Sequence, residues 1–159
     1  MEARSPTSLS FVRFLVFVAL FLLIVGVILI SRSLLIAPPY AVTAFLIVFD
    51  RDGKYAQPKS IVASYLVVVG SSELFVLALG VTYLALVLNV IVVSAFIALT
   101  RFAHPPALAL TIFSYIAHDS LAFSLTSLIV LGIVVGADLL VHRNATLSRW
   151  LGLVPPDSA

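Results

Sequence analysis

The chain has 159 residues, of which 62% are hydrophobic and only 10% are charged. A soluble domain of this length exposes far more polar surface, so the composition excludes that class and indicates an integral membrane protein. A net charge of +2 gives no reason to expect nucleic acid as a partner, and the absence of cysteine excludes thiolate chemistry and disulfides.

Six apolar segments follow one another, and we expect each to form a helix: 11–30, 34–49, 60–79, 82–99, 107–117 and 121–141. The first is long for a signal sequence and has no small-residue cleavage site, so we interpret it as a retained membrane helix. Four of the segments are long enough to span as ordinary helices of about 20 residues. We place the turn between the third and fourth at Gly80, with Gly70–Glu73 as the alternative.

The two shorter segments each follow or contain a proline pair, Pro38–Pro39 and Pro105–Pro106. Each half of the chain therefore contains, in order, a long helix, a proline pair, a short apolar segment, a polar loop and a second long helix. Within a single membrane domain, 1–159, we expect a first repeat at 11–79, a second at 82–142, and a cytoplasmic tail at 143–159. Weak duplication of this kind is typical of transporter folds. Chance similarity in an apolar chain is the alternative.

Basic residues decide between six crossings and four crossings with two re-entrant segments, because cytoplasmic loops hold the excess of Lys and Arg. Six crossings leave only Arg32 outside and place these residues inside: Arg4, Arg13, Arg51, Lys54, Lys59, Arg101, Arg143 and Arg149. The predicted fold class is thus an all-α polytopic membrane protein made of two inverted three-segment repeats, each with a proline-broken short helix. We expect a multi-pass protein of the cell membrane with both termini cytoplasmic.

Three crossings per half place the two halves in opposite orientations, so the proline-broken helices enter the membrane from opposite faces. Helix N-termini carry unpaired N–H groups and partial positive charge, and they bind anions readily. Two such termini near the midplane predict a small-anion site, with free N–H donors at Ala107, Leu108 and Ala109. The residues expected to bind the substrate are His104, Pro105, Pro106, Ala107, Leu108, Pro38, Pro39, Arg101, Thr43 and Thr111.

His104 has two readings of equal weight. It either donates a hydrogen bond or a positive charge to the anion, or it satisfies backbone groups freed by the prolines. Arg101, one helical turn earlier, is either an interfacial anchor or the cation that gathers substrate at the inner mouth. Asn89 lies in the middle of a segment, so we expect its side chain to face protein rather than lipid.

Nothing in the sequence indicates an enzyme. His104, His118 and His142 lie in three different regions, so we expect no metal site and no cofactor. The His118–Ser120 stretch is read as a loop and a helix cap. Gly132 and Gly136 are spaced for close packing, within the bundle or between subunits. Together with the thin bundle, this spacing predicts a homo-oligomer in lipid.

The motif His104-Pro105-Pro106, preceded by Thr100-Arg101, resembles the signature of the HPP family of small integral membrane proteins. The loop Ala56–Lys59 ("AQPK") resembles the family's Gln-Pro-Arg/Lys loop at a fitting distance. The chain has Ala107-Leu108 where members usually carry a Gly pair, and Ala63-Ser64-Tyr65 where they carry Gly-Gly-His. An Asn pair typical of the family's last helix is replaced near Ala137-Asp138. The family is usually described with four membrane spans, and the resemblance implies transport of nitrite, as proposed for plastid and cyanobacterial members.

The sequence therefore supports two hypotheses. The first is a transporter or facilitator for a small anion, with nitrite as the named candidate, acting through a midplane site between two broken-helix N-termini. The second is a non-transporting structural or regulatory membrane subunit. The expected partners are membrane lipid, the small anion and further copies of the chain.

Overall fold

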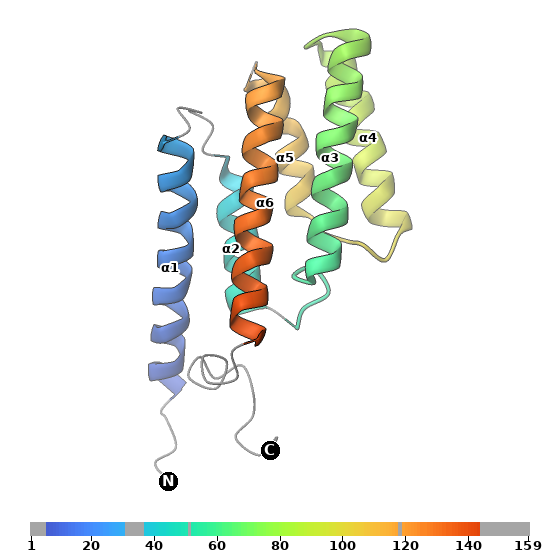
Figure 1. Ribbon diagram of the computed structural model, residues 1–159. Helices are drawn as coiled ribbons and strands as arrows, with labels where there is room; N and C mark the ends of the chain where they lie inside the picture. The colour runs from blue at the N-terminus through green and yellow to red at the C-terminus, as the bar shows by residue number, and fades with distance from the viewer. Residues whose placement is uncertain (1–5, 31–36, 51, 118, 144–159) are drawn as a thin grey trace.

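The computed structural model describes residues 6–30, 37–50, 52–117 and 119–143, and within these ranges the chain is all-helical, without strands (Figure 1). The helices are α1 (Pro6–Ile30), α2 (Pro38–Phe49), α3 (Pro58–Leu79), α4 (Tyr83–Leu99), α5 (Pro106–Ile116) and α6 (Ser120–Arg143). The expected all-α class is confirmed, and each expected segment corresponds to one helix with its ends shifted by a few residues. Most of the expected cytoplasmic tail lies outside the described residues.

Proline is the first residue of four helices, α1, α2, α3 and α5. In the last three, Pro38, Pro58 and Pro106 occupy the first helical position. A proline there forfeits nothing, because the first N–H groups of a helix have no intrahelical acceptor. The residues before Pro38 and Pro58 have extended backbones, as the residue preceding a proline prefers. The proline pairs therefore start helices in this chain and do not kink continuous ones.

Other helix ends follow equally local chemistry. Gly80 ends α3 with φ of +69°, a region in which residues with a Cβ are strained. The expected turn at Gly80 is confirmed, since residues 70–73 continue within α3. The Thr82 hydroxyl accepts a hydrogen bond from the Ala85 N–H at 3.2 Å and caps α4. Asp119 caps α6 in the same way, accepting from the Ala122 N–H at 2.9 Å.

In the described part of the chain, three helices are long and apolar enough to cross a membrane: 11–30, 58–79 and 120–140. The fourth expected full span, α4, has 17 residues and rises about 25 Å. It is shorter because Thr82 caps its start and Thr100 already has an extended backbone (φ −113°, ψ 166°) ahead of the His-Pro-Pro motif. Helices α2 and α5 are shorter still, with 12 and 11 residues.

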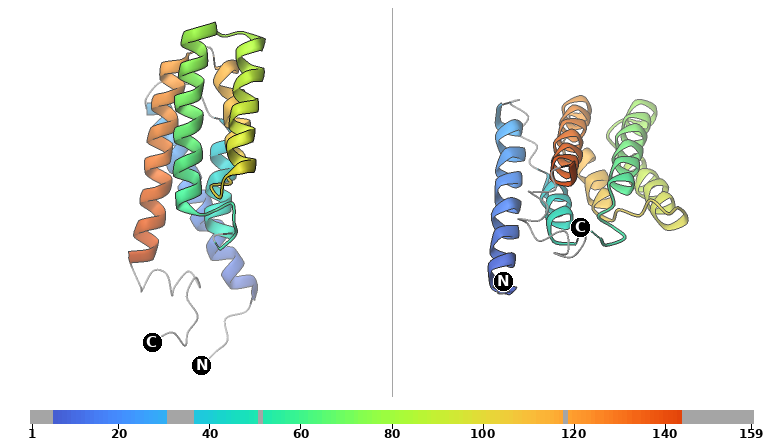
Figure 2. Two further views of the ribbon diagram at one scale, coloured as in Figure 1. Left: turned by 90° about the vertical axis from the view of Figure 1, so that its right-hand side faces the viewer. Right: turned by 60° about the horizontal axis from the view of Figure 1, so that its bottom comes forward.

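Consecutive helices run in alternating directions (Figure 1). Helix α1 packs on α2 and α6, and α4 packs on α3 and α5, so α1 and α4 lie at opposite edges of the bundle (Figure 2). Between them, α2 packs against α5 and α3 against α6. The loop between α2 and α3 lies toward the end where α1 begins and α6 ends, and the α3–α4 turn lies at the other end.

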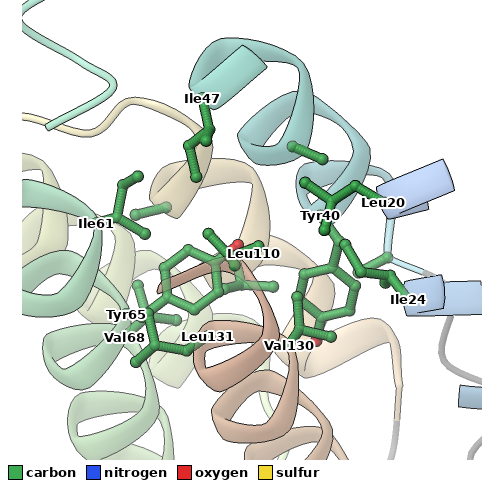
Figure 3. Packing of buried hydrophobic residues seen from close by; sticks show 14 of the residues in the cluster. Leu20, Ile24, Tyr40, Ile47, Ile61, Tyr65, Val68, Leu110, Val130 and Leu131 are labelled. Carbon is green, nitrogen blue, oxygen red and sulfur yellow. The ribbon is translucent and has the colours of Figure 1, made fainter. Parts of the chain in front are cut away.

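A continuous apolar core fills the middle of the bundle and includes Ile24, Val68, Leu110 and Val130, each at most 1% exposed. Figure 3 shows the rings of Tyr40 and Tyr65 among these apolar side chains. Tyr40 is 1% exposed and Tyr65 0%. Because buried hydroxyls need hydrogen-bond partners, the hydroxyls of these two tyrosines require other polar groups inside the bundle.

Candidate functional site

His104 is fully buried in the short connection between α4 and α5. Its Nδ1 lies 2.7 Å from the backbone carbonyl oxygen of Tyr55, and its Nε2 lies 3.0 Å from Oγ1 of Thr43. Because a carbonyl oxygen only accepts, Nδ1 carries a hydrogen. His104 thus joins three separate segments: its own loop, the loop before α3, and α2.

Thr43 is the centre of this arrangement. Besides His104, its Oγ1 lies 3.0 Å from the Tyr65 hydroxyl and 3.0 Å from the carbonyl oxygen of Pro39. The tyrosine comes from α3, and its ring centroid is 6.0 Å from that of His104. We call Thr43, Tyr65, His104 and the Tyr55 carbonyl the His104 cluster. It lies where the second turn of α2 meets the start of α5.

The His104 cluster accommodates both protonation states of the imidazole. When the ring is neutral, the Thr43 hydroxyl donates to Nε2 and Tyr65 donates to Oγ1. When the ring is protonated, Nε2–H donates to Oγ1, and the Thr43 hydrogen turns to the Pro39 carbonyl. Each state satisfies every group with the heavy atoms unmoved, so rotation of one hydroxyl is enough to exchange them.

Thr111 occupies on α5 the place that Thr43 has on α2. In each, the hydroxyl oxygen lies within hydrogen-bond distance of the carbonyl oxygen four residues earlier, 3.0 Å from Thr43 to Pro39 and 2.9 Å from Thr111 to Ala107. Each is fully buried. Only Thr43 bonds to His104, whereas the carbonyl of Thr111 accepts a hydrogen bond from Ser114 at 2.8 Å. Of the residues expected to bind substrate, the structure joins His104 and Thr43 through their side chains.

The remaining predicted site residues divide by exposure. Arg101 is exposed, with its guanidinium carbon 5.9 Å from the centroid of the Phe102 ring, so it lies outside the His104 cluster. The second proline of each pair, Pro39 and Pro106, is buried, while Pro38 and Pro105 are exposed.

The prediction of free N–H donors at the start of α5 is wrong for two of the three groups. The Ala107 N–H donates to the His104 carbonyl, and the Leu108 N–H donates to the Pro105 carbonyl, each at 3.0 Å. These short turns form because the chain already curls into the helix at Pro105 (φ −55°, ψ −32°). Near the motif, the Ala107 and Leu108 N–H groups are therefore already paired within the first turn.

Two acidic side chains lie inside the helices. Glu73 is within α3, and Ser124 of α6 donates to its Oε1 at 2.5 Å. Asp138 of α6 is buried. Among the described residues, no three His, Cys, Asp or Glu side chains come together in a group that could hold a metal ion.

Sequence reasoning missed Tyr65 and Ser64 as members of this region. The Ser64 hydroxyl donates to the Phe102 carbonyl at 3.0 Å and ties the loop that carries His104 to α3. Both residues stand where the resemblance expects part of a Gly-Gly-His motif. That departure is the one signal in the sequence that points to them, since helical spacing alone does not say which face of α3 meets His104.

A comparison with models of protein families matches residues 3–150 to the family TM_HPP, described as "HPP, transmembrane region". Neither the curated proteins nor the solved structures yield a match.

Proposed function

The chain belongs to the HPP transmembrane family, and from this premise we propose that it is a transporter or facilitator for a small anion, with nitrite as the candidate. The observation that carries the proposal is the buried bond between His104 and Thr43. It joins the second turn of α2 to the connection that leads into α5, and these are the two helices that follow the proline pairs. Discontinuous helices meeting in the interior are the usual location of transporter binding sites.

The proposed anion site uses side chains in place of backbone donors. A protonated His104 supplies positive charge through Nε2–H, and the Thr43 and Tyr65 hydroxyls supply two further donors. In the described conformation Nε2 and Oγ1 bond each other at 3.0 Å and His104 is 0% exposed, so this is a closed state. We propose that an anion enters between α2 and α5 by replacing the His104–Thr43 hydrogen bond.

The helix packing supports the proposed inverted repeat. When α1, α2 and α3 are exchanged with α4, α5 and α6, the α1–α2 contact corresponds to α4–α5, and α3–α4 corresponds to α6–α1. The contact between α3 and α5 likewise corresponds to that between α6 and α2. The pairs α2–α5 and α3–α6 map onto themselves. The proposed pseudo-twofold axis then relates α2 to α5, the helices between which Thr43 and His104 bond, and inverted-repeat transporters bind their substrates at the interface between the repeats.

A second candidate function is a non-transporting structural or regulatory subunit. The observation that favours it is the completeness of the His104 cluster, in which the imidazole nitrogens and both hydroxyls all have partners. A fully satisfied buried polar network rigidifies a bundle and fixes its register. The two candidate functions differ in one respect. A transporter must break hydrogen bonds of the His104 cluster, whereas a structural or regulatory subunit keeps them.

Anion flux into proteoliposomes tests the proposed function, with nitrite, nitrate, formate and chloride offered in parallel. Nitrite should enter faster than into protein-free liposomes. The double variant Pro105→Ala/Pro106→Ala should lose that flux while remaining folded, because alanine favours helix in the segment before α5 and so moves His104 away from Thr43. Pro58→Ala is the matched control, since Pro58 also starts a helix but at a loop, and it should retain the flux. If no anion enters faster than into empty liposomes, the transport function is rejected.

We further propose six crossings in the cell membrane, with both termini cytoplasmic. The loop of residues 52–57 lies toward the end of the bundle where α1 begins (Figure 1), which supports this topology. Because the chain has no cysteine, Lys54→Cys and Val81→Cys each introduce a single thiol. An impermeant reagent applied from outside should label Val81→Cys and spare Lys54→Cys. The opposite result would contradict the proposed topology and would fit four crossings with two re-entrant segments.

A homo-oligomer is proposed on the basis of α6. A Cβ built on Gly132 or Gly136 meets no other atom of the described chain within 4 Å, so these glycines do not serve close packing within the bundle. They leave a face that a second copy can approach closely. Crosslinking in native membranes should yield a dimer or larger species that Gly132→Leu weakens. A monomer in membranes and in detergent alike would contradict the proposal.

A further inference from the structure

Only one side chain of the His104 cluster can carry a positive charge. Thr43 and Tyr65 contribute hydroxyls and Tyr55 contributes a carbonyl oxygen, all of them neutral groups. His104 itself is 0% exposed, with Nδ1 2.7 Å from the Tyr55 carbonyl oxygen and Nε2 3.0 Å from Oγ1 of Thr43. Neither partner is a carboxylate. A proton bound to His104 therefore creates a positive charge that has no counter-ion within the cluster.

Charged residues of the surrounding segments do not bond to the imidazole either. In the two loops that meet at the cluster and at the start of α3, the charged residues that the structure describes are all exposed: Asp50, Asp52, Lys54, Lys59 and Arg101. Helices α2 and α5 contain no charged residue. Glu73 lies about 12 Å beyond Tyr65 along α3 and accepts a hydrogen bond from Ser124 of α6. A further titratable neighbour is Tyr40, whose ring centroid is 6.5 Å from that of Tyr65 and whose hydroxyl bonds to Ser127.

This isolation couples the binding of an anion to the binding of a proton. A single charge inside a protein is costly unless an opposite charge lies beside it. An anion next to a neutral imidazole leaves one unpaired charge in the bundle, and so does an imidazolium without an anion. An anion next to a protonated His104 leaves none. Each ion therefore favours the binding of the other, and this effect is reciprocal.

We propose that the chain carries one proton together with each anion, and that His104 holds this proton; the inference rests on the proposed transport function. In the neutral cluster Nδ1 carries the hydrogen and Nε2 accepts from Thr43. A proton from water on the side of entry binds to Nε2, and Nε2–H and the Thr43 hydroxyl then donate to the anion. On the other side Nε2 returns the proton to water, the anion leaves, and Thr43 donates to Nε2 again. One negative and one positive charge cross together, so no net charge moves.

The wild-type chain in proteoliposomes that contain a pH-sensitive dye tests this coupling, with nitrite as the probe. Nitrite added outside at equal pH should acidify the lumen by one proton for each ion that enters. An imposed potassium diffusion potential should leave the initial rate of entry unchanged. Free nitrous acid crosses lipid unaided, so the rates in protein-free liposomes are subtracted.

The outcomes of this experiment separate the coupling from the transport itself. Nitrite entry without acidification, or at a rate that follows the imposed potential, would overturn proton coupling and leave the proposed transport function standing. No nitrite entry above that of protein-free liposomes would reject the transport function and the coupling with it.

Two variants test whether His104 is the group that holds the proton, each compared at equal amounts of protein shown to be folded by circular dichroism. His104→Gln keeps a side chain that donates and accepts hydrogen bonds but does not take up a proton, and it should stop the acidification. Glu73→Gln is the matched control, since it removes a titratable group of α3 that bonds to Ser124, and it should retain both nitrite entry and acidification. Acidification that persists in His104→Gln, or that disappears in Glu73→Gln, would show that another group carries the proton.

Discussion

The bundle holds a second group of buried polar side chains besides the His104 cluster. Ser72 of α3, Asn89 of α4 and Ser114 of α5 are joined by hydrogen bonds of 3.0 Å, and we call them the Asn89 cluster. His104 and Asn89 are each 0% exposed. Both ring nitrogens of His104 have partners, whereas Oδ1 of Asn89 has none. Buried polar groups that have all their partners stabilise the contacts between the segments they join, whereas an unpaired buried acceptor lowers stability. The hydrogen bonds of the His104 cluster therefore link its segments more firmly than those of the Asn89 cluster do.

The largest expected effect is on the His104 cluster. His104→Ala leaves the Tyr55 carbonyl and Thr43 without their partner and opens a cavity between α2, α3 and α5. We expect the free energy of unfolding to fall by about 2–4 kcal/mol, measured by circular dichroism during SDS titration of the protein in mixed micelles. A loss below about 1 kcal/mol, the usual range for hydrogen bonds between membrane helices, would mean that the cluster does not link the segments as described.

An intermediate effect is expected at Ser72. Ser72→Ala removes the hydroxyl that bonds to both Asn89 and Ser114, so the Asn89 amide nitrogen and the Ser114 hydroxyl each lose a partner. The free energy of unfolding should fall by about 1–2 kcal/mol in the same titration. Ser71→Ala is the control, because Ser71 lies next to it on α3 and is only half-buried. Equal losses in the two variants would mean that the Ser72 bonds to Asn89 and Ser114 do not stabilise the bundle.

The smallest effect on the free energy of unfolding is expected at Asn89. Asn89→Leu replaces a side chain that has an unpaired oxygen with an apolar one of similar volume. The change in unfolding free energy should stay within about 1 kcal/mol of zero, because removal of an unsatisfied group offsets the lost bond to Ser72. A loss as large as that of His104→Ala would remove the distinction between the clusters.

Much of the fold follows from local chemistry in the sequence. Pro38, Pro58 and Pro106 start helices, Gly80 ends one and Asp119 caps one, each for reasons that neighbouring residues supply. The start of α2 could be placed only roughly from the pattern. Ala37 is apolar and continues the predicted segment, but its backbone is extended in the structure.

The site was predictable in part. His104 and Thr43 stand out as polar residues beside the proline pairs, and they meet in the structure. Their partner Tyr65, and the partners of Asn89, depend on how α3, α4 and α5 are rotated about their axes, which no single helix records. Two of the three free N–H donors expected at α5, those of Ala107 and Leu108, are paired in the structure because Pro105 already has helical backbone angles.

The central claim is that the meeting point of α2 and α5 carries the anion, and the pair Thr43→Val and Thr111→Val tests it most directly. Both variants lose a hydroxyl that bonds to the carbonyl four residues earlier, but only Thr43 contacts His104. In proteoliposomes, Thr43→Val should reduce nitrite flux about tenfold, the effect of losing roughly 1.4 kcal/mol of binding in the rate-determining state. Thr111→Val should retain the wild-type flux. Equal flux in the two variants would contradict the claim that this site conducts the anion.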